Sequence, residues 1–292
     1  MLNLAEPSLN FGQIISEKYK DLTKSEKQIA DYLRTNQEES AFLSAGDLAS
    51  RLGLSEATLV RFARSLGFDS YPAMREVLQD NFRRRVTHSA RIRSRLNELR
   101  EAGDIYERLV ASEIDYMTQS LESVNRAALQ QAVELIKSRQ RIFIFGVGPS
   151  IALVDQIRIR LERFGRQMIP LTTAGREFLE PLLSMTKNDL LFAIGFFDAS
   201  PALQLVLDYA REAGCPIIFL TDTLDTIIGD KADVVLSARR GPVSGFHSHI
   251  VPMTIINAIL LAIASEQSGV MENLDKLDEL RDRLKDYTIS ST

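Results

Sequence analysis

Hydroxyl and guanidinium side chains recur at one-turn spacing between residues 55 and 64. They belong to Ser55, Thr58, Arg61 and Arg64, and Glu56 accompanies them. Arginine donates paired hydrogen bonds to guanine, whereas serine and threonine hydroxyls suit bases or phosphates. On one helix, Ser55, Thr58 and Arg61 would make the nearest contacts with a duplex, and Arg64 would meet a backbone phosphate. The segment therefore predicts a DNA-reading surface.

The residues around this segment supply the scaffold that such a helix requires. A helix-turn-helix needs a small residue where its first helix presses on the second, and Ala49 has that place. It also needs a turn residue that tolerates positive φ, and Gly53 provides one. Ser55 is then the expected N-cap of the second helix. The expected inter-helix core is Leu48, Leu52, Leu54, Leu59 and Phe62. The alternative is a plain helical hairpin with a solvated basic face.

A glycine-containing loop follows an apolar run at residues 141–145. It reads Gly146-Val-Gly148-Pro-Ser150 and precedes a predicted helix. Glycines at a strand-to-helix turn let backbone N–H groups approach an anion, and the helix N-terminus adds partial positive charge. Ser150 adds a hydroxyl donor. The loop lacks the Gly-Lys-Ser/Thr of a P-loop and the third glycine of a dinucleotide site, so it predicts an anion site of another kind.

Two later strand ends offer further hydroxyls. Ser200 closes the segment that follows the apolar run 190–194, and Thr221 follows the run 217–220. Ligands of open parallel sheets bind beyond the carboxyl ends of the strands. Ser150, Ser200 and Thr221 are therefore expected to line one crevice. The alternative is that Ser150 and Ser200 only cap helices.

Two histidines, His247 and His249, precede a long apolar helix at 251–266. We expect His247 to contact the ligand or to donate a hydrogen bond. No carboxylate is adjacent to the pair, and the single cysteine, Cys215, cannot form a thiolate cluster. The sequence therefore predicts neither a metal nor another cofactor.

Apolar runs alternate with helical patterns in the C-terminal part. Such alternation is typical of an α/β fold with a doubly wound, Rossmann-like parallel sheet. The expected strands are residues 141–145, 168–171, 190–194, 217–220 and 234–236, and the expected helices are 151–164, 175–185, 199–213, 251–266 and 273–286. Ahead of them, short helical patterns at 23–32, 44–52, 55–66 and 71–82 predict an all-α N-terminal domain.

These patterns divide the chain into four parts. They are a helix-turn-helix domain (1–82), a helical linker (83–122), an α/β domain (123–270) and a C-terminal helix (271–292). Arginines crowd the start of the linker, between residues 83 and 100. This run either binds phosphates or forms a solvated helix face, and the residue types leave both interpretations open.

Composition sets the broad class of the protein. A length of 292 residues suits two domains, and 45% apolar with 25% charged residues is normal for a globular protein. Residues 1–100 hold 16 basic and 13 acidic side chains, whereas the remainder holds 19 and 26, which favours an N-terminal nucleic-acid contact. One cysteine, no leader pattern and no span-length apolar run predict a cytoplasmic protein without a membrane partner.

The chain resembles the RpiR family of bacterial regulators, in which a helix-turn-helix domain precedes a SIS (sugar isomerase) domain. The resemblance extends from Leu22 to Glu266. It rests on Leu54–Phe68 followed by Tyr71-Pro72, on the glycine loop, and on residues 244–250. It implies a SIS fold, a repressor or activator role, a phosphosugar or related effector, and a homodimer or homotetramer.

The chain departs from the family in one loop. SIS domains hold a phosphate with hydroxyl-bearing residues in two loops, and Ser150 matches the first. The second loop usually reads like Ser-x-Ser-Gly-x-Thr, but here it is Gly195-Phe-Phe-Asp198-Ala-Ser200, so one hydroxyl remains. Asp198 would repel a phosphate that it faced. Either the effector is not a usual sugar phosphate, or Arg176 or backbone N–H groups compensate.

The sequence thus predicts a transcription regulator whose effector changes the spacing of two DNA-reading helices. The expected effector site comprises Gly146, Gly148, Ser150, Ser200, Thr221 and His247. One alternative is an aldose–ketose isomerase, for which Glu177, Glu180 and His247 are the available general bases. The other alternative is an architectural DNA binder that responds to no effector.

Overall fold

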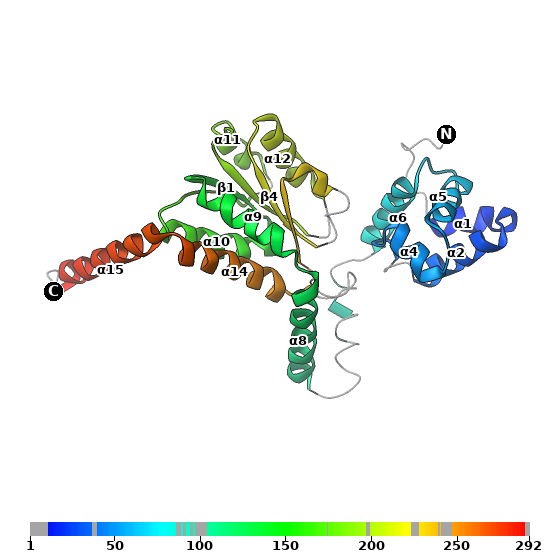
Figure 1. Ribbon diagram of the computed structural model, residues 1–292, viewed down its shortest axis with the longest axis horizontal. Helices are drawn as coiled ribbons and strands as arrows, with labels where there is room; N and C mark the ends of the chain where they lie inside the picture. Colours follow the sequence, from blue (N-terminus) through cyan, green and yellow to red (C-terminus); the bar gives the residue numbers. More distant parts are fainter. Residues whose placement is uncertain are drawn as a thin grey trace. The chain divides into compact units, whose positions relative to one another are not determined.

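The computed structural model describes residues 11–36, 40–85, 89, 92–93, 96, 104–173, 175–196, 199–222, 228–238, 240 and 247–289. They form two compact units, a helical one and an α/β one, each with its own hydrophobic core (Figure 1). Asp198 and residues 244–246 lie outside the described residues. Of the arginines between residues 83 and 100, only Arg93 has a described side chain.

The helical unit contains the four helices that the sequence predicts, together with a first helix that it does not. They are α1 (Phe11–Lys18), α2 (Lys24–Thr35), α4 (Ala45–Leu52), α5 (Glu56–Ser65) and α6 (Tyr71–Arg85), with a 3-10 turn η1 at Tyr19–Asp21. A capping box begins α2, because Thr23 and Glu26 each accept the other's backbone N–H. Ile29, Leu48 and Phe62 are fully buried where the helices meet.

The α/β unit holds a five-stranded parallel sheet in the order β2-β1-β3-β4-β5. The strands are β1 (Arg141–Phe145), β2 (Gln167–Leu171), β3 (Leu190–Ile194), β4 (Ile217–Thr221) and β5 (Val234–Ser237). The helices are α8 (Ile105–Ser123), α9 (Arg126–Lys137), α10 (Ile151–Arg163), α11 (Leu179–Leu182), α12 (Pro201–Glu212), α14 (Ile250–Glu266) and α15 (Ser268–Ile289), with 3-10 turns η2 (Gly148–Ser150), η3 (Arg176–Phe178) and η4 (Gly229–Lys231).

Successive strand residues point to opposite faces of this sheet, so it has two apolar layers. Ile142 and Ile144 pack beneath α9, α10 and α14, whereas Phe143 and Phe145 pack beneath α11 and α12 (Figure 1). The predicted doubly wound sheet is confirmed. Its strand order reverses between β1 and β3, which is where ligands of such sheets bind.

The two C-terminal helices differ in their packing. α14 buries one face in the sheet layer, and Val270 near the start of α15 is 1% exposed in that same core. No single helix among the described residues is long and apolar enough to cross a membrane. α14 and the part of α15 up to Lys285 satisfy that criterion only as a pair, which is bent by 97°.

α8 is assigned to the linker by the sequence, but it packs on α14 and belongs to the α/β unit.

Cys215 is 3% exposed, and burial raises the pKa of its thiol to about 12. It is a core residue, as the sequence predicts.

Candidate DNA-reading helix and strand-end site

The turn between α4 and α5 has the backbone that the sequence predicts. Gly53 adopts a left-handed φ of 66°, and the N–H of Leu54 donates to the carbonyl of Ala49 at 2.9 Å. Ala49 is 4% exposed, so only a small side chain fits between the helices. The Ser44 hydroxyl accepts the N–H of Asp47 and fixes the start of α4. The helix-turn-helix is therefore held by both termini of α4.

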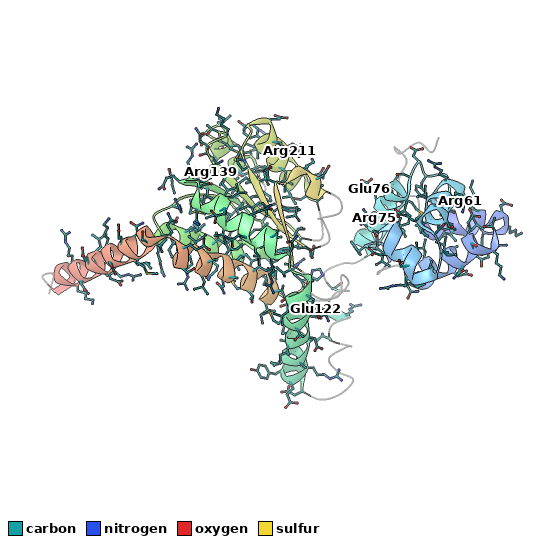
Figure 2. All side chains as sticks on the ribbon, viewed as in Figure 1. Arg61, Arg75, Glu76, Glu122, Arg139 and Arg211 are labelled. Atoms are coloured by element: carbon teal, nitrogen blue, oxygen red, sulfur yellow. The ribbon has the colours of Figure 1, made fainter. Side chains whose placement is uncertain are left out.

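α5 presents one apolar and one polar face. Leu59, Phe62 and Ala63 are buried against the other helices. Of the five predicted DNA contacts, Thr58 is half-buried, and the rest are exposed: Ser55, Glu56, Arg61 and Arg64. Figure 2 marks Arg61 on this helix. The fold thus places all five on the solvent side of a helix whose other side forms the core.

Ser55 stands at the N-cap position, but its hydroxyl does not cap the helix. The Oγ of Ser55 lies 2.8 Å from the Oγ1 of Thr58, which also accepts from Nη2 of Arg61 at 3.3 Å. The sequence predicts that the Ser55 hydroxyl accepts a backbone N–H of α5, but this hydroxyl pairs with the Thr58 side chain instead. The three residues expected to be nearest DNA are linked to one another.

Sequence reasoning missed the anchor of α5. The hydroxyl of Ser65 donates to the carboxylate of Glu26 on α2, and Glu26 is 9% exposed. Burial by itself would raise the pKa of Glu26, but hydrogen bonds from Ser65 and Thr23 and the charge of Arg61 bring it below its usual value. The carboxylate therefore stays ionised and holds α5 against α2.

In the glycine loop, Gly146 and Gly148 have different structural roles. A Cβ on Gly146 would lie 2.6 Å from Val154, so Gly146 lets β1 pack against α10. Its N–H donates to the carbonyl of Leu171, which removes it as an anion donor. Gly148 has a φ of 59°, a backbone conformation that favours glycine, and a Cβ there would meet no neighbour. Ser150 is 8% exposed and does not cap α10.

At the two ends of the loop after β3, Gly195 allows close packing and Ser200 caps a helix. A Cβ on Gly195 would lie 2.4 Å from Leu203, and the Gly195 N–H donates to the carbonyl of Leu220. The Ser200 hydroxyl accepts the N–H of Leu203 at 3.2 Å and caps α12. The capping interpretation therefore describes Ser200 in this structure, and it does not describe Ser150.

Thr221 ends β4 on the face covered by α12, and it is fully buried. Its Oγ1 has no hydrogen-bond partner among the described residues. The N–H of Ala238 donates to the carbonyl of Thr221 at 2.7 Å. Whether Thr221 contacts a ligand stays a prediction.

A buried ion pair lies at the same edge and was not predicted. The Nε and Nη2 atoms of Arg240 both donate to Oδ2 of Asp222, at 3.0 and 2.6 Å, and both side chains are less than a tenth exposed. The guanidinium carbon lies 3.9 Å from the ring centroid of Phe196, whose ring stacks near His249. Burial lowers the pKa of Arg240, whereas the charge of Asp222 and its hydrogen bond raise it.

The histidine segment connects this edge to α8. His247 is half-buried. Burial, and then the charge of Arg240, lower the pKa of His249. Between them, the Ser248 hydroxyl donates to the Glu113 carboxylate at 2.6 Å, and the Ser248 N–H donates to the carbonyl of Arg240. Within the described part of the chain, no three His, Cys, Asp or Glu side chains gather as metal ligands.

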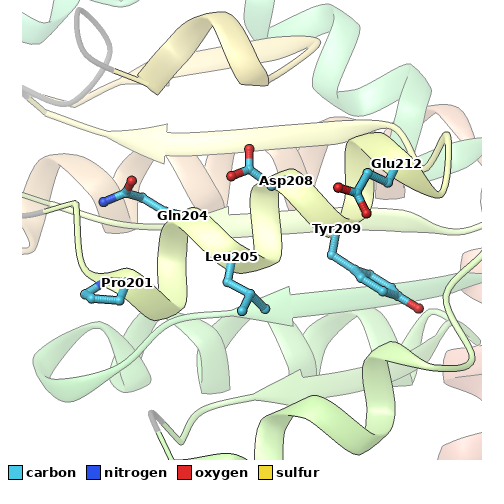
Figure 3. Close-up of a pocket in the computed structure, with 6 residues that line it drawn as sticks. All are labelled: Pro201, Gln204, Leu205, Asp208, Tyr209 and Glu212. Carbon is cyan, nitrogen blue, oxygen red and sulfur yellow. The ribbon is translucent and has the colours of Figure 1, made fainter.

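The α/β unit has two hollows that none of the predicted effector residues lines. One, of about 580 Å³, runs along α12, and Figure 3 shows its lining. The lining residues are Pro201, Gln204, Leu205, Asp208, Tyr209 and Glu212. The other, of about 450 Å³, lies between α8 and Ile250. The remaining predicted groups, Arg176, Glu177 and Glu180, are exposed on the segment after β2.

Comparison with known proteins supports both halves of the chain. Residues 9–85 match the helix-turn-helix domain of the rpiR family, and residues 134–263 match the SIS domain. An HTH-type transcriptional regulator of Haemophilus influenzae is 26% identical over 79% of this chain and 81% of its own. Another from Thermotoga maritima is 23% identical over 90% of this chain and 95% of its own.

Solved structures show the same fold. The Vibrio vulnificus NanR protein, solved in complex with ManNAc-6P, has a TM-score of 0.63 at 21% identity and covers 94% of this chain and 99% of its own. The sugar isomerase domain of an RpiR transcription factor from Sphaerobacter thermophilus has a TM-score of 0.55 at 24% identity, over 59% of this chain and 97% of its own. With its helix-turn-helix and its SIS domain in this order, the chain belongs to the RpiR family of transcription regulators.

Proposed function

We propose that this regulator binds duplex DNA through α5 and that a phosphorylated, carbohydrate-derived effector at the carboxyl edge of its sheet changes that affinity. The observation that carries the proposal is the helix-turn-helix itself: a rigid apolar face holds α5 while its hydroxyl and guanidinium groups face solvent. Recognition helices place their N-terminal residues against base edges, and Ser55, Glu56 and Thr58 begin α5.

The hydrogen-bond chain at the start of α5 prepares it for this contact. Ser55 and Arg61 both engage Thr58, so the three side chains share one arrangement before DNA arrives. A group already held in position loses less conformational entropy on binding. Arg64, one turn beyond Arg61, is the phosphate contact in this proposal.

The effector contacts are proposed at the β1 loop and its neighbours. The N–H of Gly148 and the start of α10 form the anion cradle, with the Ser150 hydroxyl beside it. Gly146 serves by packing, and Ser200, Thr221 and His247 form the wall toward β3, β4 and α14. The ManNAc-6P bound by the V. vulnificus relative supports the choice of a sugar phosphate as the effector class.

A regulatory role, and not isomerisation, is the function that we propose for the SIS unit. The three general bases available to an isomerase are not brought together. Glu177 and Glu180 follow β2 at one edge of the sheet, whereas His247 follows β5 at the other. We propose that the protein acts as a cytoplasmic homodimer and represses its target.

The test is a titration of full-length protein with duplexes selected from a random pool, repeated with a panel of sugar phosphates that includes ManNAc-6P. We expect sequence-selective binding that falls with salt, and a change in affinity of at least fivefold with one panel member. Failure to retain any duplex at low salt would refute the DNA-binding half. A panel member that binds tightly yet leaves DNA affinity unchanged would refute the regulatory half.

A further inference from the structure

The outward face of α14 is free of charge. Seven residues of this helix are exposed, and one of them is Glu266, which lies at the end of the helix and pairs with Lys137 at 2.7 Å. The other six are Ile250, Thr254, Asn257, Ala258, Leu261 and Ser265. A helix that covers a sheet normally turns charged residues to water. Depletion of charge is instead the mark of the buried centre of a protein interface.

Burial within the chain does not explain this face. The opposite side of α14 already fills the core, where Val251, Ile255 and Ile259 are 4% exposed or less. Leu261, by contrast, is 70% exposed. The chain therefore keeps a large apolar side chain in water on the side of α14 that faces away from the core.

A groove of about 450 Å³ opens beside the start of the same helix. Ile250 forms one wall, and Ile114, Met117 and Leu121 of α8 form the other. The hydroxyl of Thr254 lies 3.6 Å from the sulfur of Met117, so Thr254 sits at the edge of this groove. Ile114 and Leu121 are 59% and 67% exposed, and no residue of α8 is buried. The groove is an apolar hole without a filler in the described chain.

The six uncharged exposed residues of α14 are spaced symmetrically. An antiparallel copy, turned about a point between Asn257 and Ala258, sets Leu261 opposite Thr254 and Ile250 opposite Ser265. Two-fold interfaces require this property, because the same patch must fit itself. Ala258 at the crossing point lets the two helices approach to about 8 Å. Leu261 of each copy then lies next to the groove of the other.

We propose that this face of α14, together with the α8 groove, is the two-fold interface between two copies of this chain. Leu261 is the knob and the α8–α14 groove is the hole. A second copy is the occupant because one chain carries both parts at mirrored positions along a single helix. The interface gives the proposed homodimer a location, and it rests on packing alone, independently of the effector.

The first experiment compares Leu261→Arg with wild-type full-length protein by light scattering after size exclusion. Wild type should have a mass of at least twice 32.8 kDa, and Leu261→Arg should fall to half that assembly or less, with unchanged circular dichroism. The matched control is Leu183→Arg, at an 81% exposed position after α11, which should keep the wild-type mass. A monomeric wild type, or a Leu261→Arg variant that assembles normally, overturns the proposal.

The second experiment tests the symmetry. Positions next to a two-fold axis face themselves, so Ala258→Cys should form a disulfide between copies under mild oxidation. Cys215 is buried and leaves the background clean, and Leu183→Cys should stay uncrosslinked. Absence of the Ala258→Cys crosslink overturns this register. DNA binding is scored separately: a wild type that binds duplex yet fails both tests loses only the interface, whereas an assembly that passes both yet ignores DNA loses only the proposed function.

Discussion

Arg240 lies between Asp222 and Phe196 at the carboxyl edge of the sheet. Its guanidinium donates twice to one carboxylate oxygen and rests on the ring, with its carbon 3.9 Å from the centroid. Three strand ends are joined in this way, since Phe196 follows β3, Asp222 follows β4 and Arg240 follows β5. The geometry of the proposed effector edge therefore depends on a buried charge pair.

Removing one member of this pair is expected to destabilise the α/β unit. Asp222→Ala leaves the Arg240 cation buried without its carboxylate, which costs about 3 kcal/mol. Asp222→Leu combined with Arg240→Met should lose less than the sum of the two single changes, because no charge stays behind. Scanning calorimetry of the full chain measures the effect. Asp278→Ala, which removes an exposed ion pair with Arg281, is the control and should leave the transition in place. Equal losses for Asp222→Ala and the control would contradict the prediction.

The two arginines of α5 are expected to fail in different ways. Arg61→Ala should weaken binding to the selected duplex by about 1–3 kcal/mol and relax selectivity at one base pair. Arg64→Ala should weaken all duplexes alike and reduce the salt dependence by about one counterion. Fluorescence anisotropy at several salt concentrations separates the two effects. Arg211→Ala on α12, marked in Figure 2, should bind DNA as wild type does. If Arg61→Ala weakened every sequence equally, Arg61 would be a phosphate contact instead.

Alanine at the two loop glycines should be harmful for different reasons. Gly146→Ala pushes a methyl group to 2.6 Å from Val154 and should cost about 1–3 kcal/mol through overpacking. Gly148→Ala meets no neighbour, but its φ of 59° makes an L-residue unfavourable by about 1–2 kcal/mol. Because asparagine tolerates this backbone, Gly148→Asn should recover part of the loss and Gly146→Asn should not. Thermal unfolding measures all four variants, and a recovery at Gly146 would contradict the assignment.

Acidification is expected to weaken the α/β unit through His249. Its pKa in the folded chain is lowered, so between about pH 6.5 and that lowered value the unfolded chain takes up more protons than the folded one. Stability should therefore fall as the pH drops through this window, and it should not change through this group above it. His249→Asn should flatten that part of the stability profile, measured by urea unfolding from pH 8 to pH 5. A variant that keeps the wild-type slope would show that another group titrates there.

Local patterns predicted most of the secondary structure. The helix predicted at 23–32, the left-handed Gly53 and the strand at 141–145 are all confirmed. These features depend on residues close together in sequence, where spacing and backbone preference decide the outcome. Helix α1 was missed because its burial depends on distant partners, such as Phe68 against Phe11.

The site was predictable only in part. Gly148 and the polar face of α5 follow from local motifs, but Glu26 meets Ser65 across 39 residues, and Arg240 meets Phe196 from another strand. The spacing of these residues in the sequence does not predict that they are in contact. Thr221 is fully buried at the end of its strand, and its contact with the effector stays a prediction.

Among the described residues, the core of the helical unit draws on positions 11–78, and the two cores of the α/β unit draw on positions 116–274. The two units therefore share no core residue in the described part of the chain. A substitution in a loop of the α/β unit can therefore change its ligand preference while the core that supports α5 keeps all of its residues.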